Sequence, residues 1–398
     1  MKPTTSTAPA PRSELNAAVE PASPGEFPLP AIGPIQLETP VILAPMAGVT
    51  DVSFRALCRS FGAGIYVNQM ITARALVENN QTTWKLAEFG PDESPRSIQL
   101  YGTEERSIAE AVRRLVGEGR VDHIDMNFGC PAPKVTRLGG GSALPVKRRL
   151  LRKMIKAAVE AAGDVPVTIK FRKGIDDDHL TFLETGTIAA ELGCAAIALH
   201  GRTARDLYSG HADWNAIGEL KAHVTDIPVF GNGDIWEPWD ALRMMRQTGC
   251  DGVVIGRGCL GRPWLFRDLA AVFRGEQPAP PPDLTEVAAI MVDHAQRLVD
   301  WYDDASQVRQ FRKHAIWYVT GFPLGGERRA RLAGVSSVDE LCAVVDDFPE
   351  SPFPTGALRV KRSHSGGPRR VVLPHGWLDN IDDETPLPAD AGAKSSGG

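Results

Sequence analysis

Residues 124–144, IDMNFGCPAPKVTRLGGGSAL, join a buried-looking strand to a turn that carries a thiol. Residues 121–126 alternate as a strand does, and Asn127, Gly129 and Pro131 then interrupt that pattern. Cys130 therefore falls on a turn at the carboxyl end of the strand, which is where barrel enzymes place their chemistry. Many free cysteines are only small buried hydrophobes, so the surrounding sequence has to decide between the two interpretations.

The sequence on both sides alternates between short runs rich in Val and Ile and longer helical patterns, which is typical of βα units. We expect eight strands, at residues 41–44, 64–70, 97–102, 123–127, 166–171, 195–201, 228–233 and 252–258. This number predicts an α/β protein with a TIM (β/α)8 barrel. The alternative is a doubly wound open sheet, which is weakened because no GxGxxG motif follows a predicted strand.

The barrel is predicted to occupy residues 34–274, and a proline-rich spacer at residues 275–283 separates it from amphipathic patterns further on. These patterns, at residues 284–300, 305–318 and 337–347, predict a small all-α helical domain over residues 284–350. Residues 1–33 and 355–398 are rich in small, polar and proline residues, so we expect disordered termini. The second tail carries a basic patch made of Arg359, Lys361, Arg362, Arg369 and Arg370.

The composition describes a globular protein, with 43% hydrophobic residues and a formal net charge of −5. No global positive charge indicates nucleic acid, so such a partner would need a local basic surface. The six cysteines lack the spacing of zinc or iron–sulfur ligands, and no metal site is expected. With no signal peptide and no membrane-spanning run in the sequence, we expect a cytoplasmic protein.

Unusual residues end several of the predicted strands, and a barrel brings these ends to one face. The first strand ends in Pro45, Met46 and Ala47. The small residues in this stretch would allow a flat ligand to lie against the backbone. Gln99 on the third strand can both donate and accept at the edge of a pyrimidine-like ring. Lys170 on the fifth strand either extends its amine to solvent or meets an anionic ligand.

The sixth strand ends in His200 and Arg202, for which a structural histidine with one backbone bond is the alternative reading. The seventh and eighth strands end in glycine-containing loops, and these two loops commonly bind phosphate in this fold. Their candidate ligands are Asn232, Gly233, Asp234, Gly256 and Arg257. A phosphate site, an amide and a central lysine together favour flavin mononucleotide (FMN) over a sugar phosphate.

Reduction of a C=C bond by a flavin also requires a proton donor, and Cys130 is the candidate. An ordinary thiol has a pKa of about 8.5 and is mostly protonated at neutral pH. Lys134 and Arg137 lie close by in sequence and would suit a substrate phosphate, yet they would also lower the thiol pKa. The sequence leaves these two effects unresolved.

The chain resembles the tRNA-dihydrouridine synthases, most closely the bacterial B-type subgroup, over about residues 35–318. The motifs that carry this resemblance are APMAGVTD, SIQLYG, DMNFGCPAPKV, GGGSAL, IKFRKG, LHGRT, GNGDI and GRGCLGRPW. The resemblance implies an FMN barrel, a helical tRNA-binding domain and NADPH as electron donor. It also implies that hydride from reduced FMN goes to C6 of a tRNA uridine and a proton from Cys130 goes to C5. We expect a monomer.

Carried over by motif, the resemblance assigns flavin contacts to Pro45, Met46, Ala47, Gln99, Lys170 and His200, and the phosphate end to the two glycine loops. It makes Asn127 and Arg202 substrate contacts, with Lys134 beside them. Basic residues of the helical domain, namely Arg309, Arg312 and Lys313, resemble the family's tRNA-binding helix, although a solvated helix face is the plain alternative. The chain departs from the family at Gln69, where a carboxylate is usual.

Two other functions remain open at this point. A dihydroorotate dehydrogenase-like FMN barrel that acts on a free small molecule would leave the helical domain without a purpose. An RNA-binding protein that catalyses no reaction would leave Cys130 and the flavin motifs without a purpose.

Overall fold

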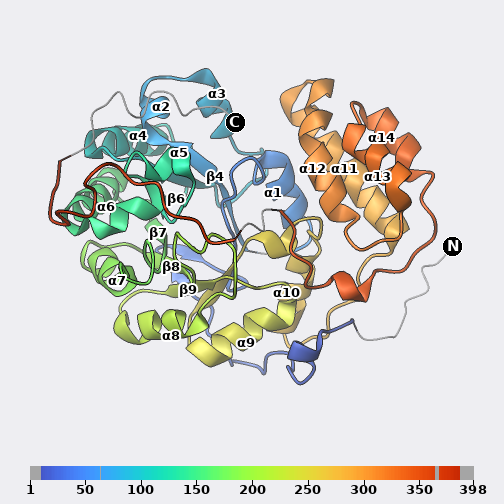
Figure 1. Cartoon of the computed structure of the whole chain (residues 1–398), viewed down its shortest axis with the longest axis horizontal. Coiled ribbons are helices and arrows are strands. Elements are labelled where there is room, and N and C mark those ends of the chain that lie inside the picture. The colour runs from blue at the N-terminus through green and yellow to red at the C-terminus, as the bar shows by residue number, and fades with distance from the viewer. Residues whose placement is uncertain (1–9, 63, 364–366, 386–398) are drawn as a thin grey trace.

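The centre of the molecule is a closed barrel of eight parallel strands, in the order β10, β3, β4, β5, β6, β7, β8 and β9 (Figure 1). The computed structural model describes residues 10–62, 64–363 and 367–385. The strands are β3 (Val41–Leu43), β4 (Ile65–Thr72), β5 (Ser97–Tyr101), β6 (His123–Phe128), β7 (Val167–Arg172), β8 (Ala196–His200), β9 (Val229–Asn232) and β10 (Gly252–Ile255). Each lies at a predicted position, and the TIM (β/α)8 barrel is confirmed.

Strand β6 shows why a polar interior forms inside an apolar shell. Ile124, Met126 and Phe128 are almost fully buried and belong to the main hydrophobic core. The alternate residues His123 and Asp125 line the space inside the barrel. Successive side chains of a strand point to opposite faces, so one strand contributes to both environments.

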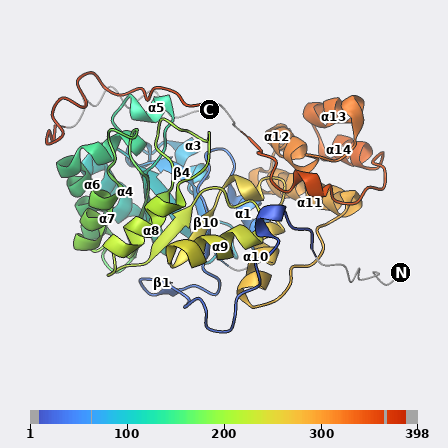
Figure 2. The ribbon, with the colours of Figure 1, turned by 60° about the horizontal axis from the view of Figure 1, so that its bottom comes forward.

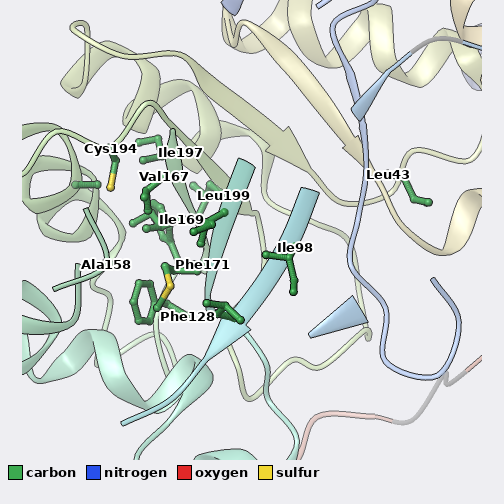
Figure 3. Close-up of a cluster of buried hydrophobic side chains, with 14 of the residues drawn as sticks. Leu43, Ile98, Phe128, Ala158, Val167, Ile169, Phe171, Cys194, Ile197 and Leu199 are labelled. Carbon is green, nitrogen blue, oxygen red and sulfur yellow. The ribbon is translucent and has the colours of Figure 1, made fainter. Parts of the chain in front are cut away.

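The shell between strands and helices continues through the neighbouring strands. Figure 3 shows Ile169, Phe171 and Leu199 gathered with Phe128, and Ala158 lies in the same cluster. These side chains are buried, and burial of apolar surface stabilises by about 25 cal/mol per Å². The outward face of the barrel therefore provides the stability, which leaves the inward face available for polar groups.

Helices surround the barrel on its outside (Figure 1). They are α1 (Val52–Arg59), α2 (Ala73–Val77), α3 (Gln81–Leu86), α4 (Glu105–Gly117), α5 (Pro133–Thr136), α6 (Arg148–Ala162), α7 (Phe182–Glu191), α8 (Trp214–His223), α9 (Pro238–Thr248) and α10 (Leu265–Phe273). Helix α9 begins with a capping box of Glu237 and Asp240 and ends at Gly249, which has a φ of 69°. A left-handed glycine is a common helix terminator.

The helical domain consists of α11 (Leu284–Tyr302), α12 (Val308–Tyr318), α13 (Gly325–Gly334) and α14 (Val338–Val345). It has its own hydrophobic core, in which Met291, Phe311 and Leu341 are fully buried. Figure 2 shows this domain beside the barrel, near α1. Helix α13 is absent from the sequence prediction because it begins with two glycines and carries three arginines, a weak apolar pattern.

The N-terminal segment differs from the expected disorder over its described part, residues 10–33. Ser13 hydrogen-bonds to Glu237 through its backbone N–H (2.9 Å) and its hydroxyl (2.5 Å), and the Asn16 amide donates to Asp240 (3.0 Å). Further along, Ile32 of the short strand β1 (Ala31–Ile32) packs with the residues inside the barrel. Specific polar contacts, Ile32 and a small hydrophobic cluster of Val19, Ala22 and Phe27 with α9 and α10 fix a segment whose composition predicts disorder. Residues 1–9 lie outside the described part.

The C-terminal segment also packs on the protein over residues 355–363 and 367–385, where disorder was expected. Of the predicted basic patch, Arg359 pairs with Glu237 and Asp240, both at 2.8 Å. Arg362 is 2% exposed, and its guanidinium donates to backbone carbonyls, including that of Trp317 (3.3 Å). These two arginines therefore have structural partners within the protein. Residues 386–398 lie outside the described part.

Candidate active site

A network of buried polar side chains crosses the inside of the barrel. The Gln99 amide donates to Asp125 (2.6 Å), and the Thr168 hydroxyl donates to the other oxygen of Asp125 (2.7 Å). The strand register places these three residues side by side. Burial raises the pKa of Asp125 to about 6. Asp125 was not predicted as a site residue, although it is a carboxylate between the core residues Ile124 and Met126.

Asn127 connects this network to the turn that carries Cys130. Its amide nitrogen donates to the Gln99 carbonyl oxygen (2.7 Å), and its own oxygen accepts the backbone N–H groups of Gly129 (3.1 Å) and Cys130 (2.9 Å). From the next strand, the buried Arg172 donates to the Gly129 carbonyl (3.0 Å). Two side chains that sit on adjacent strands therefore hold the cysteine turn. The sequence analysis did not single out Arg172.

The thiol of Cys130 is protonated at neutral pH. Cys130 is half-buried, and burial is the main cause that raises its pKa above the ordinary thiol value. The backbone N–H of Ala132 and the cations Arg172 and Lys134 lower that pKa, with smaller effects. Lys134 itself is exposed on α5, directly after the turn. The structure thus resolves the competition between burial and nearby cations in favour of burial.

Lys170 and Asn232 form a second polar pair inside the barrel. The Lys170 ammonium donates to the Asn232 side-chain oxygen (2.9 Å), and the Asn232 amide donates to the Val254 carbonyl (2.7 Å). Burial lowers the pKa of Lys170 to about 7. His200 is buried beside this pair's strands, and burial followed by the charges of nearby cations lowers its pKa well below 6.5. His200 is therefore neutral.

Arg202 and Asp234 form a buried ion pair in which Nη2 of Arg202 donates to both carboxylate oxygens, at 2.8 and 2.9 Å. Arg202 is 1% exposed and also donates to the carbonyls of Ser209 and Gly210. Asp234 in turn accepts the backbone N–H of Ala212 (2.6 Å). The ion pair uses Nη2 of Arg202, while Nη1 lies 3.4 Å from Nε2 of His200, and a contact of Arg202 with the substrate stays a prediction. The structure places Arg202 as a support of the loops after β8 and β9.

The remaining predicted flavin residues lie around the mouth of the barrel. Pro45 and Met46 are half-buried, and Ala47 is exposed. Gly233 has a φ of 124°, and a Cβ there would lie 2.5 Å from the Ala212 side chain, so the turn requires glycine. At Gly256 the nearest heavy atom to an added Cβ would be the Ala44 Cβ, 3.9 Å away. A ligand can therefore approach the backbone at Gly256.

Arg257 extends from the same loop and stacks on aromatic rings. Its guanidinium carbon lies 4.1 Å from the centre of the Tyr208 ring and 5.4 Å from that of Trp236. Tyr208 also lies under the guanidinium of Arg172, at 5.4 Å. One ring thus separates a candidate phosphate ligand from the arginine that holds the cysteine turn.

Gln69, the departure from the family pattern, supports the loop after β3. Its side-chain oxygen accepts the backbone N–H of Gly48 (2.7 Å), and the residue is 7% exposed. The Gly48 carbonyl accepts a hydrogen bond from the ammonium of Lys313. The neutral amide is therefore sufficient to hold this loop in place against the helical domain.

The three predicted basic residues of the helical domain differ in their surroundings. Arg309 is exposed on α12. Arg312 donates to the carbonyls of Val335 (2.7 Å) and Gly334 (2.9 Å) at the end of α13. Lys313 reaches the Gly48 loop of the barrel. Of the three, Arg309 is the one whose side chain lies fully on the solvent face.

The sequence model of the family described as dihydrouridine synthase (Dus) matches residues 42–352. The chain belongs to the dihydrouridine synthase family. It is similar to a protein of Mycobacterium tuberculosis (strain ATCC 25618 / H37Rv) named probable tRNA-dihydrouridine synthase. The two are 52% identical over 377 residues, which cover 92% of this chain and 96% of the relative. The family resemblance seen in the motifs is confirmed.

This dihydrouridine synthase is also similar to B-type relatives. The tRNA-dihydrouridine synthase B of Pseudomonas aeruginosa is 42% identical over 318 residues, which cover 80% of this chain and 95% of that protein. Among solved structures, histamine dehydrogenase from Rhizobium sp. 4-9 superposes with a TM-score of 0.51 and 12% identity, covering 85% of this chain and 64% of that one. At this identity the likeness concerns the fold alone.

The described residues contain neither a cluster of metal ligands nor a membrane-spanning helix. Within these residues, no group of three or more His, Cys, Asp or Glu side chains gathers as metal ligands would. None of the helices in the described ranges combines the length and apolar character needed to cross a membrane.

Proposed function

We propose that this enzyme reduces the C5=C6 bond of specific uridines in tRNA to 5,6-dihydrouridine. The observation that carries the proposal is Cys130, a half-buried and protonated thiol fixed at the barrel mouth by Asn127 and Arg172. Membership of the dihydrouridine synthase family supports the same reaction. A general acid has to be protonated and held in place, and Cys130 meets both conditions.

The donor groups of the barrel fit FMN. Lys170 supplies a buried amine beside Asn232, and the open backbone at Gly256 with Arg257 suits a phosphate. The other residues that would hold the cofactor are Pro45, Met46, Ala47, Gln99, His200, Gly233 and Asp234. When bound, FMN would supply the hydride that goes to C6 of uracil, with NADPH as electron source.

The residues of this chain then act on uracil. Cys130 donates its proton to C5, and Asn127 keeps the turn fixed while that proton moves. Uracil must leave its stack to reach the mouth, since the barrel interior cannot admit a folded RNA. Lys134 and Arg309 are exposed cations that would contact tRNA phosphates, whereas Arg312 and Lys313 would also maintain the surface around Arg309. The cytoplasmic location and the monomeric state stay predictions.

The decisive experiment is mass-spectrometric mapping of dihydrouridine in tRNA from cells with and without this protein. We expect dihydrouridine to disappear from defined tRNA positions when the gene is deleted and to return with the wild-type gene. An unchanged dihydrouridine map would overturn the proposal. The map also names the reduced position, and it separates tRNA reduction from action on a free small molecule.

The cofactor is tested separately on the purified protein. We expect the protein to show flavin absorbance and to be reduced by NADPH. Protein that is colourless and cannot be reconstituted with FMN would contradict the cofactor assignment.

A further inference from the structure

Residues 367–385, here called the strap, run beside the loops at the barrel mouth (Figures 1 and 2). The strap begins at the loop after β8, where the Arg369 backbone N–H donates to the Arg205 carbonyl (2.9 Å). It then crosses to the loop that follows Cys130, which we call the glycine loop (residues 138–147). The strap thus lies over the glycine loop.

Trp377 anchors the strap in the glycine loop. It is 6% exposed, and its indole N–H donates to the Ala143 carbonyl (2.8 Å). Gly139 has a φ of 75°, and a Cβ there would lie 2.5 Å from the Trp377 ring, so the ring fills the space left by this glycine. The ammonium of the buried Lys147 lies 4.8 Å from the ring centre and donates to the Asn380 carbonyl (2.5 Å).

The other side of the glycine loop contacts Cys130 directly. The Ser142 backbone N–H (3.0 Å) and hydroxyl (3.1 Å) both donate to the Cys130 carbonyl. Gly141 has a φ of 54°, and a Cβ there would lie 2.5 Å from the same carbonyl oxygen. The loop is therefore packed between the Trp377 indole on one side and the backbone of Cys130 on the other.

The strap also packs Val371, Leu373 and Leu378 against the main hydrophobic core, and it forms exposed ion pairs with α6. Arg148 pairs with Asp382 (2.9 Å), and Lys153 pairs with Glu384. Exposed pairs of this kind contribute little, commonly about 0 to 1 kcal/mol. Trp377, which is buried and hydrogen-bonded, is consequently the residue through which the strap acts on the loop.

We propose that Trp377 is a positioning residue for Cys130, which it holds in place through Ala143, Ser142 and the glycine loop. The role of these contacts in catalysis rests on the proposed function, in which Cys130 is the proton donor. The contacts between Trp377, the glycine loop and Cys130 can themselves be tested without RNA. Loosening the loop exposes the thiol, which burial now keeps protonated.

The test is the pH profile of Cys130 alkylation by iodoacetamide in the purified full-length protein, followed by peptide mass spectrometry. Trp377→Phe keeps a ring against Gly139 and removes the indole N–H. We expect its alkylation rate at pH 7.5 to rise about threefold, which is half a unit in thiol pKa, with the midpoint moving toward the ordinary thiol value. Trp377→Ala should give a larger shift in the same direction.

The half-buried Cys342 of the helical domain serves as the internal reference, and its rate should not change. Trp301→Phe is the matched control, because this indole N–H has no hydrogen-bond partner among the described residues. A Trp377→Phe profile equal to that of the wild type overturns the proposal, even if Trp377→Ala fails to fold.

Activity distinguishes this proposal from the proposed function. In single-turnover reduction of tRNA uridine, Trp377→Phe should lower the maximal rate and leave the tRNA concentration that gives half of that rate unchanged. A shifted alkylation profile with a wild-type reduction rate would overturn the role of Trp377 in catalysis, whereas Cys130→Ala tests the proton donor itself.

Discussion

The side-chain oxygen of Asn127 accepts the backbone N–H of Cys130 at 2.9 Å. Asn127 is the last residue of strand β6 that points into the barrel, and it thereby also holds the backbone of Cys130. The family resemblance assigns Asn127 to the substrate, but its side chain is already used to hold the turn. This relationship makes the Asn127 amide one of the groups that set the position of Cys130, together with Arg172 and Ser142.

Asn127→Ala should lower the single-turnover rate of uridine reduction by about tenfold or more. It removes two hydrogen bonds to the turn, and each contributes about 1 kcal/mol. Asn127→Asp is the matched variant, since it keeps the acceptor for the turn and replaces the donor to Gln99 and Met70 with a carboxylate oxygen. We expect Asn127→Asp to fall between the wild type and Asn127→Ala. Equal rates in all three proteins would remove Asn127 from the mechanism.

Cys130→Ala should keep its flavin and lose most uridine reduction. In the wild type, the acid form is required, and burial raises the pKa of the Cys130 thiol. The single-turnover rate should therefore stay constant through neutral pH and fall only as pH rises above the ordinary thiol pKa of about 8.5. Full activity in the alanine variant, or a rate that falls already between pH 6 and 7, would contradict the assignment.

Lys170→Met should reduce the ratio of flavin to protein in the purified enzyme. It should also change how the stability of the cofactor-free protein depends on pH. Burial depresses the pKa of Lys170 to about 7 in the folded protein, whereas it is about 10.4 in the unfolded chain. The contribution of Lys170 to the free energy of unfolding is therefore fully present above about pH 10.4, and it is lost as pH falls through about 7. The variant also leaves the Asn232 oxygen without its donor.

Melting curves of both cofactor-free proteins between pH 6 and 10 test this effect. Near pH 10 the variant should melt below the wild type, because of the unpaired Asn232 oxygen. As pH falls to 6, the Tm of the variant relative to the wild type should rise by about 2 °C or more. A difference in Tm that is independent of pH would show that the pKa of Lys170 is not depressed.

Arg309→Ala should weaken tRNA binding and reduce the slope of log Kd against log salt by about 0.9. The reason is that Arg309 is exposed on α12, whereas Arg312 and Lys313 are tied to the α13 end and to Gly48. Arg274→Ala, an exposed arginine paired with Glu276 at the end of α10, is the control. An unchanged salt slope for Arg309→Ala would contradict the tRNA-binding role of this helix face.

The eight strands and the location of Cys130 could be predicted because their signals are local. An apolar run, a glycine or proline stop and the next apolar run are all visible in neighbouring residues. The partners of the polar side chains could not be predicted in this way. Arg202 and Asp234 are far apart in sequence, and only the closed barrel shows that they pair with each other.

The ends of the chain show a second limit of sequence reasoning. Composition predicts disorder for the strap because polar residues, glycine and proline dominate it, yet Trp377 is buried and Val371, Leu373 and Leu378 pack against the main hydrophobic core. Similarly, Ser13 and Asn16 find buried carboxylate partners that no periodic pattern indicates. Average composition fails where a few specific contacts replace a hydrophobic face.

The segments before the barrel and after the helical domain meet at Glu237 and Asp240, where Ser13 and Asn16 arrive from the first segment and Arg359 from the second. Since the two carboxylates are buried, separating either segment removes hydrogen-bond or ion-pair partners from a charge in the interior. Unfolding of the barrel and of the helical domain is thereby coupled. We expect one cooperative calorimetric transition for the whole molecule, although its two hydrophobic cores would allow two.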